Sequence, residues 1–295
     1  MARPFRSGFV SILGKPNVGK STLLNRLVGE HLAGVSKKPQ TTRGVIRGIL
    51  SEREGQAIFL DTPGFHAPRD PLGKWMLQEI HKAIESSDLL LWMVFPFLPD
   101  KEDEALAREL AASRIPIFLL MNQVDRVEKP KVLPVIDAYR KLFSFREIIP
   151  ISALKGDNIP VLVRKTFEAL PQNPAYFSEE LLTDQNERTI VSEIIREKVF
   201  RFTGEEVPYS SAVEIEEFQE KSENLVVINA CILVEKDSQK AILIGKGGAK
   251  VKQIGQAARQ EIERFLAKKV FLELWVKTLK NWKKDPEAMK RLGFG

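Results

Sequence analysis

The chain has 295 residues, 43% of them hydrophobic and 28% charged, which is the composition of an ordinary globular protein and excludes disordered and fibrous classes. This length allows two hydrophobic cores, so one or two domains are expected. No apolar run approaches the length of a membrane span, since the longest, residues 89–98, contains Pro96. The one cysteine, Cys231, has no partner for an internal disulfide, which favours a cytoplasmic location.

The net charge of +6 is unevenly distributed along the chain. Residues 171–235 contain 5 basic and 14 acidic residues, a net charge of −9. Residues 236–295 contain 15 basic and 6 acidic residues, a net charge of +9. A basic cluster of this size suggests a nucleic-acid partner, although a solvated charged surface is the commoner explanation.

Strand-like and helix-like segments alternate through the first half of the chain. The short apolar runs are residues 9–13, 45–50, 57–60, 89–95, 115–120 and 148–151. The helical patterns between and after them are residues 21–28, 72–84, 101–112, 132–143 and 159–170. This alternation predicts an α/β domain with a doubly wound, mostly parallel sheet, for which we set the bounds at residues 1–172. Ligands of such sheets bind at the carboxyl ends of the strands.

The second half of the chain predicts a smaller α+β domain over residues 186–280. Residues 173–185 read as a linker that follows Pro171. The predicted order is a helix, two alternating strands that form a hairpin, a short segment, a helix and a strand. The corresponding residues are 186–202, 210–219, 225–235, 238–244, 251–266 and 270–276. Periodicity leaves residues 238–244 open between strand and short helix, and residues 281–295 are expected to form a basic tail.

A glycine-rich turn joins the first strand to the first helix. It has the spacing G-x-x-x-x-G-K-S at Gly14, Gly19, Lys20 and Ser21. Such a turn directs consecutive backbone N–H groups at one point, which makes an anion site. Lys20 adds a charge for the β- and γ-phosphates, and Ser21 adds a hydroxyl ligand for Mg²⁺. The turn therefore predicts a phosphate-binding loop.

Two further segments are expected to complete the phosphate and Mg²⁺ site. Asp61 and Gly64 close the third strand, where the carboxylate can hold Mg²⁺ and the glycine N–H can approach the γ-phosphate. Thr41 and Thr42 precede the second strand, and one of them is expected to join the Mg²⁺ ligands when a γ-phosphate is present. Spacing does not separate the two threonines, and we assign Thr42.

Two later loops predict a guanine base. Asn122 and Asp125 follow the fifth strand, and the carboxylate of Asp125 can accept both N–H groups of guanine's Watson–Crick edge, which adenine does not offer. Ser152 and Ala153 follow the sixth strand, where a backbone N–H can reach the guanine oxygen. Each motif is weak alone, but their order and their positions at strand ends make the set specific.

The five motifs occur in the order typical of the translation-factor-related GTPases, and within them the chain resembles the Era-type GTPases with a C-terminal type II KH domain. Pro39-Gln40-Thr41-Thr42-Arg43 and Asp61-Thr62-Pro63-Gly64-Phe65-His66 carry this resemblance, which covers nearly the whole chain. It implies a Mg²⁺-dependent GTPase in which Lys20, Thr42 and Gly64 act on the reacting phosphate. The implied nucleotide contacts are Gly14, Lys15, Pro16, Asn17, Val18, Gly19, Lys20, Ser21, Thr22, Asp61, Thr62, Pro63, Gly64, Asn122, Gln123, Val124, Asp125, Ser152, Ala153 and Leu154; the Mg²⁺ ligands are Ser21, Thr42 and Asp61.

Three positions affect the nucleotide affinity and the hydrolysis rate that we expect of such a site. Gln123 stands where the family has lysine, so we expect weaker nucleotide binding with unchanged base choice. Phe65 stands where Ras-like enzymes have the glutamine that orients water, so hydrolysis is expected to be slow. In related GTPases an asparagine in the phosphate loop often ligates K⁺. Asn17 occupies that place, and we expect hydrolysis stimulated by K⁺.

A second glycine-rich loop, Gly245-Lys246-Gly247-Gly248, joins two predicted segments of the smaller domain. This Gly-x-x-Gly pattern is weak alone, but it lies within an α-β-β-α-α-β order that resembles the type II KH domain. Glycines there let an RNA backbone approach closely, and lysines supply phosphate contacts. The predicted RNA-binding residues are Gly245, Lys246, Gly247, Gly248, Lys250 and Lys252.

The resemblance implies small-subunit ribosomal RNA near its 3′ end and the 30S subunit as partners, a monomeric cytoplasmic protein, and a second, peripheral association with the inner membrane. Two rival interpretations remain open from the residues. One is a GTP-regulated membrane-associated cell-cycle protein whose basic tail binds anionic lipid. The other is an RNA-binding adaptor with a degenerate nucleotide site, suggested by Gln123 and Phe65. Four intact residues argue against it: Lys20, Ser21, Asp61 and Asp125.

Overall fold

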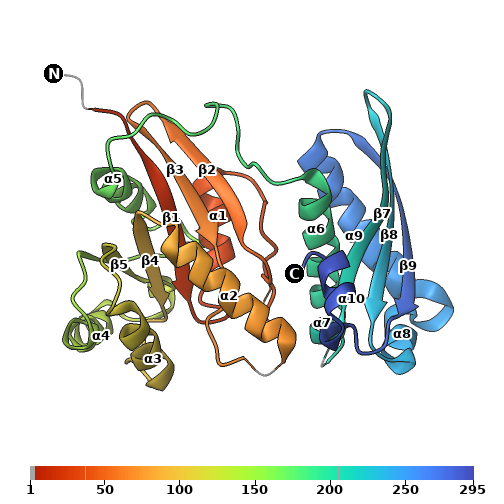
Figure 1. Ribbon diagram of the computed structural model, residues 1–295, viewed down its shortest axis with the longest axis horizontal. Coiled ribbons are helices and arrows are strands. Elements are labelled where there is room, and N and C mark those ends of the chain that lie inside the picture. Colours follow the sequence, from red (N-terminus) through yellow and green to blue (C-terminus); the bar gives the residue numbers. More distant parts are fainter. Residues whose placement is uncertain (1–3, 37, 69, 205) are drawn as a thin grey trace. The chain divides into compact units, whose positions relative to one another are not determined.

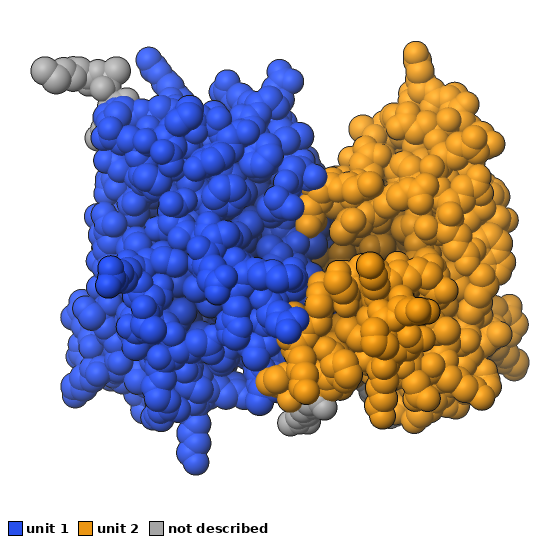
Figure 2. All heavy atoms as spheres, viewed as in Figure 1, with its two compact units in different colours: residues 1–32, 42–67, 76–184 blue, residues 33–41, 68–75, 185–295 orange. Residues whose placement is uncertain are grey.

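The described residues form two β-sheets, one in each of two structural units. Figure 2 colours the two units differently. The computed structural model describes residues 4–36, 38–68, 70–204 and 206–295. The first unit contains residues 1–32, 42–67 and 76–184, and the second contains residues 33–41, 68–75 and 185–295.

The first unit is built on a six-stranded sheet with the order β2-β3-β1-β4-β5-β6 (Figure 1). All neighbouring strands are parallel except β2 and β3, which form an antiparallel hairpin. This confirms the predicted mostly parallel, doubly wound sheet. The strands are β1 (Arg6–Gly14), β2 (Ile46–Glu52), β3 (Gly55–Asp61), β4 (Leu89–Val94), β5 (Ile117–Met121) and β6 (Glu147–Pro150).

Helices cover both faces of this sheet because successive residues of a strand point to opposite sides. On β2, a Cβ atom added to Gly48 would meet Leu24 and Val28 of α1, whereas the next residue, Ile49, packs with Ala83 of α2. A Cβ atom added to Gly55 of β3 would meet Phe167 of α5, and Gly55 faces the same side as Phe59, the residue paired with Gly48. Helix α5 therefore covers the same face as α1, and the aromatic-rich core around Trp92 joins α2, α3 and α4. The helices are α1 (Lys20–Val28), α2 (Pro71–Glu85), α3 (Lys101–Leu110), η1 (Val124–Arg126), α4 (Lys129–Leu142) and α5 (Ile159–Ala169).

The segment that we predicted as a linker lies against the first unit for most of its length. Gln56 of β3 anchors it, since its side-chain oxygen accepts hydrogen bonds from the backbone N–H groups of Tyr176 and Phe177. Farther along, the N–H of Ile49 donates to the carbonyl of Leu182 over 2.8 Å. Residues 173–184 are therefore ordered by the sheet that they follow.

The second unit has a three-stranded sheet in the order β7-β8-β9, with β7 antiparallel and β9 parallel to β8. This is the strand order of the predicted α-β-β-α-α-β domain. Residues 238–244, left open by periodicity, belong to a helix, and its amino end is fixed by Gln239, whose side chain accepts from the N–H groups of Glu235 and Lys236. The elements are α6 (Glu187–Phe202), α7 (Val207–Ser210), β7 (Ala212–Ser222), β8 (Leu225–Val234), α8 (Asp237–Ile244), η2 (Lys246–Gly248), α9 (Ala249–Leu266) and β9 (Lys269–Thr278).

The end of the chain is folded, in contrast to the tail that we expected. After η3 (Trp282–Lys284), a short helix α10 (Pro286–Arg291) begins at Asp285, whose side chain caps it. Trp282 is fully buried, stacks on Phe294 and donates its indole N–H to the carbonyl of Ser210 over 3.0 Å. A buried aromatic ring with its polar atom satisfied stabilises the last fifteen residues as part of the second unit.

Among the helices that the described ranges contain, none is long and apolar enough to cross a membrane.

Candidate nucleotide and RNA sites

The predicted phosphate loop turns tightly between β1 and α1. Gly14 and Gly19 have φ angles of 143° and 107°, which L-residues rarely adopt, and Asn17 has a φ of 63°. A side chain at Gly14 would collide with the carbonyl of Met93, and one at Gly19 with the amide of Asn122. The loop therefore requires glycine at both positions for conformation and for space.

The Lys20 ammonium lies within this loop and is buried. Its Nζ donates to the carbonyl oxygens of Gly14 and Lys15, each over 3.0 Å. Burial lowers the pKa of Lys20 to about 8, against the opposing effect of Asp61. A buried ammonium held by neutral carbonyls gains much from a phosphate anion, because the anion restores the charge stabilisation lost on leaving water.

Three of the predicted oxygen ligands meet beside the loop. Ser21 Oγ lies 2.6 Å from Asp61 Oδ2 and 2.8 Å from Thr42 Oγ1. Thr42 Oγ1 donates to the same carboxylate oxygen over 3.3 Å. Thr41 points elsewhere, since its hydroxyl bonds to Ser36 and to the carbonyl of Lys38. The structure thus places Thr42, and not Thr41, with the other two side chains.

This donor set fits Mg²⁺. Two hydroxyls and one carboxylate are hard oxygen donors, which suit Mg²⁺ and leave coordination positions for waters and phosphate oxygens. Within the described ranges, no group of three or more His, Cys, Asp or Glu residues is arranged to hold a metal ion.

The segment after β3 touches the phosphate loop directly. A Cβ atom added to Gly64 would lie 2.7 to 2.8 Å from atoms of Pro16, so only glycine lets the two backbones approach this closely. The N–H of the next residue, Phe65, donates to the carbonyl of Gly14 over 3.0 Å, and its side chain packs against the apolar core. A side chain turned to the core does not orient water, which agrees with the expectation of slow hydrolysis.

Asn122 ties the base-recognition loops to the phosphate loop. Its Nδ2 donates to the carbonyl of Val18 over 2.7 Å, and its Oδ1 accepts from the N–H of Ala153 over 2.9 Å. Gln123, with φ of 65°, donates from Nε2 to the carbonyl of Asn17 over 3.4 Å. Asp125 is exposed. The Asn122 amide therefore links the phosphate loop to the loops that we predicted to bind guanine. The carboxylate of Asp125, which we predicted to recognise the base, is accessible.

Two interactions in this region were not predicted. Arg26 of α1 donates to the carbonyls of Ala153 and Leu154, and so holds the loop that we predicted to approach the guanine oxygen. Lys15 pairs with Asp100 at 2.6 Å and with Asp103 at 2.7 Å. Burial lowers the pKa of Lys15, but the two carboxylates outweigh this effect and raise the pKa overall. Neither pairing has a signal in the sequence, because the partners are separated by more than eighty residues.

The predicted RNA loop lies in the second unit between α8 and α9. Gly245, Gly247 and Gly248 have φ angles of 70°, 58° and 79°. Nothing lies within 4 Å of a Cβ atom added to Gly247 or Gly248, so this backbone is open to a ligand. Lys246 and Lys252 are exposed and Lys250 is half-buried, which brings positive charge to an accessible glycine turn.

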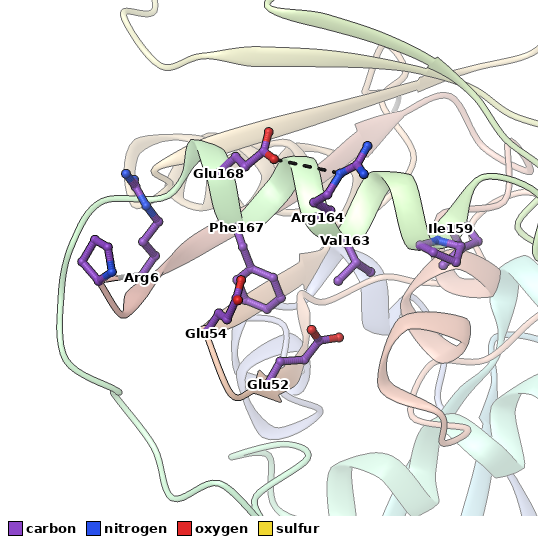
Figure 3. Close-up of a pocket in the computed structure, with 10 residues that line it drawn as sticks. Arg6, Glu52, Glu54, Ile159, Val163, Arg164, Phe167 and Glu168 are labelled. Carbon is purple, nitrogen blue, oxygen red and sulfur yellow. Dashed lines mark ion pairs between the residues drawn. The ribbon is translucent and has the colours of Figure 1, made fainter. Parts of the chain in front are cut away.

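A pocket of about 670 Å³ lies elsewhere in the first unit. It is lined by residues of α5 and the β2–β3 hairpin, among them Phe167 and Glu52 (Figure 3). This pocket is at the amino ends of β1 and β3, opposite the strand ends that carry the phosphate loop. It takes no part in the site described above.

Comparison with known proteins agrees with both units. Residues 9–123 match the family described as 50S ribosome-binding GTPase, and residues 206–283 match the KH domain. The chain is 51% identical to GTPase Era of Geobacter metallireducens, over 99% of this chain and 98% of that protein. It is 46% identical to GTPase Era of Ruminiclostridium cellulolyticum, over 98% of each.

Two solved structures share the fold of the whole chain. One is a substituted Era of Aquifex aeolicus bound to GDP and AlF4⁻, with a TM-score of 0.95, 39% identity, and coverage of 98% of this chain and 99% of that one. The other is Era in complex with MgGDPNP and nucleotides 1506–1542 of 16S ribosomal RNA, with a TM-score of 0.95, 39% identity and 99% coverage of each chain. By its phosphate loop, its Gly-x-x-Gly loop and its identity to these relatives over nearly its full length, the chain belongs to the Era family of GTPases.

Proposed function

We propose that this protein is a slow GTP-hydrolysing switch that binds small-subunit ribosomal RNA near its 3′ end during assembly of the 30S subunit. The observation that carries the nucleotide half is the convergence of Ser21, Thr42 and Asp61 beside the buried Lys20 ammonium. The 16S ribosomal RNA fragment in the solved Era complex supports the RNA half, as does the open Gly-x-x-Gly loop.

The chain's own residues account for slow hydrolysis by positioning. Lys20 neutralises charge on the β- and γ-phosphates, and Gly64 directs its backbone N–H at the γ-phosphate. Bound Mg²⁺, held by Ser21, Thr42 and Asp61, supplies further neutralisation of phosphate charge. Phe65 packs against the core and has no polar group that could activate water, so hydrolysis relies on positioning without a general base at this residue.

Measurement of phosphate release tests the proposed GTP hydrolysis. We expect wild type to release phosphate slowly from GTP and Lys20→Ala to lose this activity, because the charge next to the phosphates is removed. Lys82→Ala is the control, since Lys82 is exposed on α2 and pairs with its helix neighbour Glu79. Equal rates for Lys20→Ala and wild type contradict the proposed site.

We also propose that K⁺ stimulates hydrolysis through Asn17. Asn17 is exposed at the tip of the phosphate loop with a φ of 63°, so its side chain is on the accessible side of the turn. The test compares phosphate release in KCl and NaCl at equal ionic strength for wild type and Asn17→Ala. Wild type is expected to be faster in KCl, and the variant is expected to lose the difference. Identical wild-type rates in the two salts contradict the role of K⁺.

The switch itself is tested by RNA affinity in two nucleotide states. A fluorescent RNA with the 3′-terminal sequence of the small-subunit ribosomal RNA is titrated with the protein bound to GDP or to a non-hydrolysable GTP analogue. We expect tighter binding in one state and weaker binding of a scrambled RNA in both. The same affinity in the two states contradicts a switch while leaving RNA binding intact. We place this activity in the cytoplasm, where the ribosomal RNA is.

A further inference from the structure

The residues that precede Thr42 belong to the second unit, although Thr42 itself belongs to the first. We call the described residues 33–36 and 38–41 the strap. Figure 2 colours them with the second unit, together with helix α6. One peptide bond, between Thr41 and Thr42, therefore joins the strap to the Mg²⁺ ligand set.

The strap is held along α6 by contacts at three places. A Cβ atom added to Gly34 would lie 3.3 Å from the Cβ of Glu197, so the backbone passes close to the helix. Lys38 donates to the carbonyls of Phe200 and Thr203 at the carboxyl end of α6, where a cation also interacts favourably with the helix dipole. Arg196 makes the third contact.

The Arg196 side chain is only 2% exposed and reaches the end of the strap. Its guanidinium donates to the carbonyl of Gln40 over 3.4 Å and to the carbonyl of Thr41. It also pairs with Glu193 and lies 5.3 Å from the ring centre of Phe200. A planar fork of five donors that is fixed on two sides offers little freedom, so it sets the direction of the Thr41 carbonyl.

The direction of the Thr41 carbonyl limits where Thr42 can lie. The carbonyl shares a rigid plane with the N–H and Cα of Thr42, because the peptide bond does not rotate freely. Thr42 Oγ1 lies at 2.8 Å from Ser21 Oγ and 3.3 Å from Asp61 Oδ2. A guanidinium on α6 is thus one peptide group away from a predicted Mg²⁺ ligand.

We propose that Arg196 is a positioning residue for Thr42, and through it a determinant of selective GTP binding over GDP and of the hydrolysis rate. The inference rests on the proposed function of the nucleotide site. Thr42 is expected to join the Mg²⁺ ligands only when a γ-phosphate is present, so Arg196 supports the GTP state and not the GDP state. Helix α6 also supplies core residues of the unit that carries the RNA loop, including Ile190 and Ile194.

The test uses the full-length protein and two substitutions, Arg196→Met and Arg196→Lys. For Arg196→Met we expect affinity for a GTP analogue and the hydrolysis rate to fall about tenfold, the equivalent of one lost charged hydrogen bond. Affinity for GDP is expected to stay within about twofold of wild type. Arg196→Lys keeps the charge but not the planar group of donors, so its GTP-analogue affinity and hydrolysis rate are expected to lie between those of wild type and Arg196→Met. Arg201→Met is the matched control, since Arg201 is exposed on the same helix and contacts the ring of Phe202.

A double-mutant cycle with Thr42→Ala separates positioning from general destabilisation. If Arg196 acts through Thr42, replacing Arg196 has little further effect once the Thr42 hydroxyl is gone. Additive losses in the cycle, or equal losses of GDP and GTP-analogue affinity, overturn the inference and assign Arg196 a structural role. Wild type that does not hydrolyse GTP overturns the proposed function instead, so the two failures are distinguishable.

Discussion

The chain contains two glycine–lysine turns at helix amino ends, and they solve different problems. In the phosphate loop, glycines at φ of 143° and 107° are enclosed, and Lys20 is buried with a lowered pKa. In the Gly-x-x-Gly loop, Gly247 and Gly248 have positive φ but open space around them, and Lys246 is exposed. The phosphate loop is therefore enclosed by neighbouring residues in the absence of its ligand, whereas the Gly-x-x-Gly loop is open to solvent.

The difference follows from what each turn is proposed to bind. A guanine nucleotide has a short phosphate chain to hold in a fixed place, and a preorganised site gains affinity because little has to be ordered on binding. An RNA backbone is long and variable, and contacts to its phosphates position it without demanding one geometry. Substitutions should therefore act through space and burial in the first turn, and through backbone conformation and charge in the second.

The largest expected effect comes from filling the enclosed turn. Alanine at Gly19 would displace the amide of Asn122, which bonds to both Val18 and Ala153, and would strain a φ of 107°. We expect GDP affinity to fall about 100-fold, since strain and two lost hydrogen bonds together cost about 3 kcal/mol. Isothermal titration measures the GDP affinity. Gly247→Ala is the comparison, and its GDP affinity is expected to equal that of wild type. Equal affinities in the two variants contradict the distinction between the turns.

The burial of Lys20 predicts that GDP affinity depends on pH. With a pKa of about 8, Lys20 is charged in the free protein below pH 8, and GDP affinity is flat there. At higher pH the free protein loses a proton that binding must restore, so affinity falls by up to about tenfold per pH unit. Titrations in two buffers of different ionisation enthalpy count the protons taken up. No proton uptake at pH 9 contradicts the lowered pKa.

The same pKa has an opposite consequence for the stability of the free protein. Between about pH 8 and the ordinary lysine value of 10.5, the unfolded chain binds more protons at this position than the folded chain. The contribution of Lys20 to the free energy of unfolding therefore rises with pH across that window. Urea unfolding of wild type and Lys20→Met at several pH values isolates this contribution.

A smaller effect is expected in the open turn. Alanine at Gly247 has space but must adopt a φ of 58°, which costs an L-residue about 1–2 kcal/mol. The loop would populate its RNA-competent conformation less, so RNA affinity should fall roughly 5- to 30-fold. Gly293→Ala, at a φ of 82° and also in open space, carries the same strain outside the loop. RNA affinity reduced equally by both variants would mean that strain alone, and not this loop, explains the loss.

The smallest expected effect is at Gln123. A lysine there would add charge over the guanine ring, and at a partly exposed position this gains about 0.5–1 kcal/mol. GDP affinity of Gln123→Lys should therefore rise about two- to fivefold, with base preference unchanged because Asp125 is untouched. Titration with GDP and ADP checks both statements. Equal GDP affinity of the two proteins would falsify the expectation that Gln123 weakens binding.

Local patterns were enough to predict the fold and the glycine turns that carry both proposed sites, and the limits of these patterns are physical. The phosphate loop and the sheet follow from spacing and periodicity, because each is a property of neighbouring residues. Thr41 and Thr42 have the same side chain at adjacent positions, so only the tertiary bonds of Thr41 to Ser36 and Lys38 distinguish them. Short segments are ambiguous for a similar reason, and Asp237–Ile244 became a helix through the capping side chain of Gln239.

Hydrogen bonds between residues far apart in the chain could not be predicted from the sequence. Arg196 lies 155 residues from Thr41, and Trp282 lies 72 residues from Ser210. Neither pairing leaves a periodic signal. The basic composition of the last fifteen residues suggested a solvated tail, whereas Trp282 and Phe294 fold it back into the second unit.

The ordered segment after α5 has a consequence for solubility. β2 is an edge strand of the six-stranded sheet, and an unpaired edge is a template for pairing with another molecule. The Leu182 carbonyl accepts from the Ile49 N–H, and the Thr183 hydroxyl donates to the Arg47 carbonyl, so this stretch occupies hydrogen-bonding groups on the open side of β2. The connection between the two units thereby also shields the first unit from edge-to-edge aggregation.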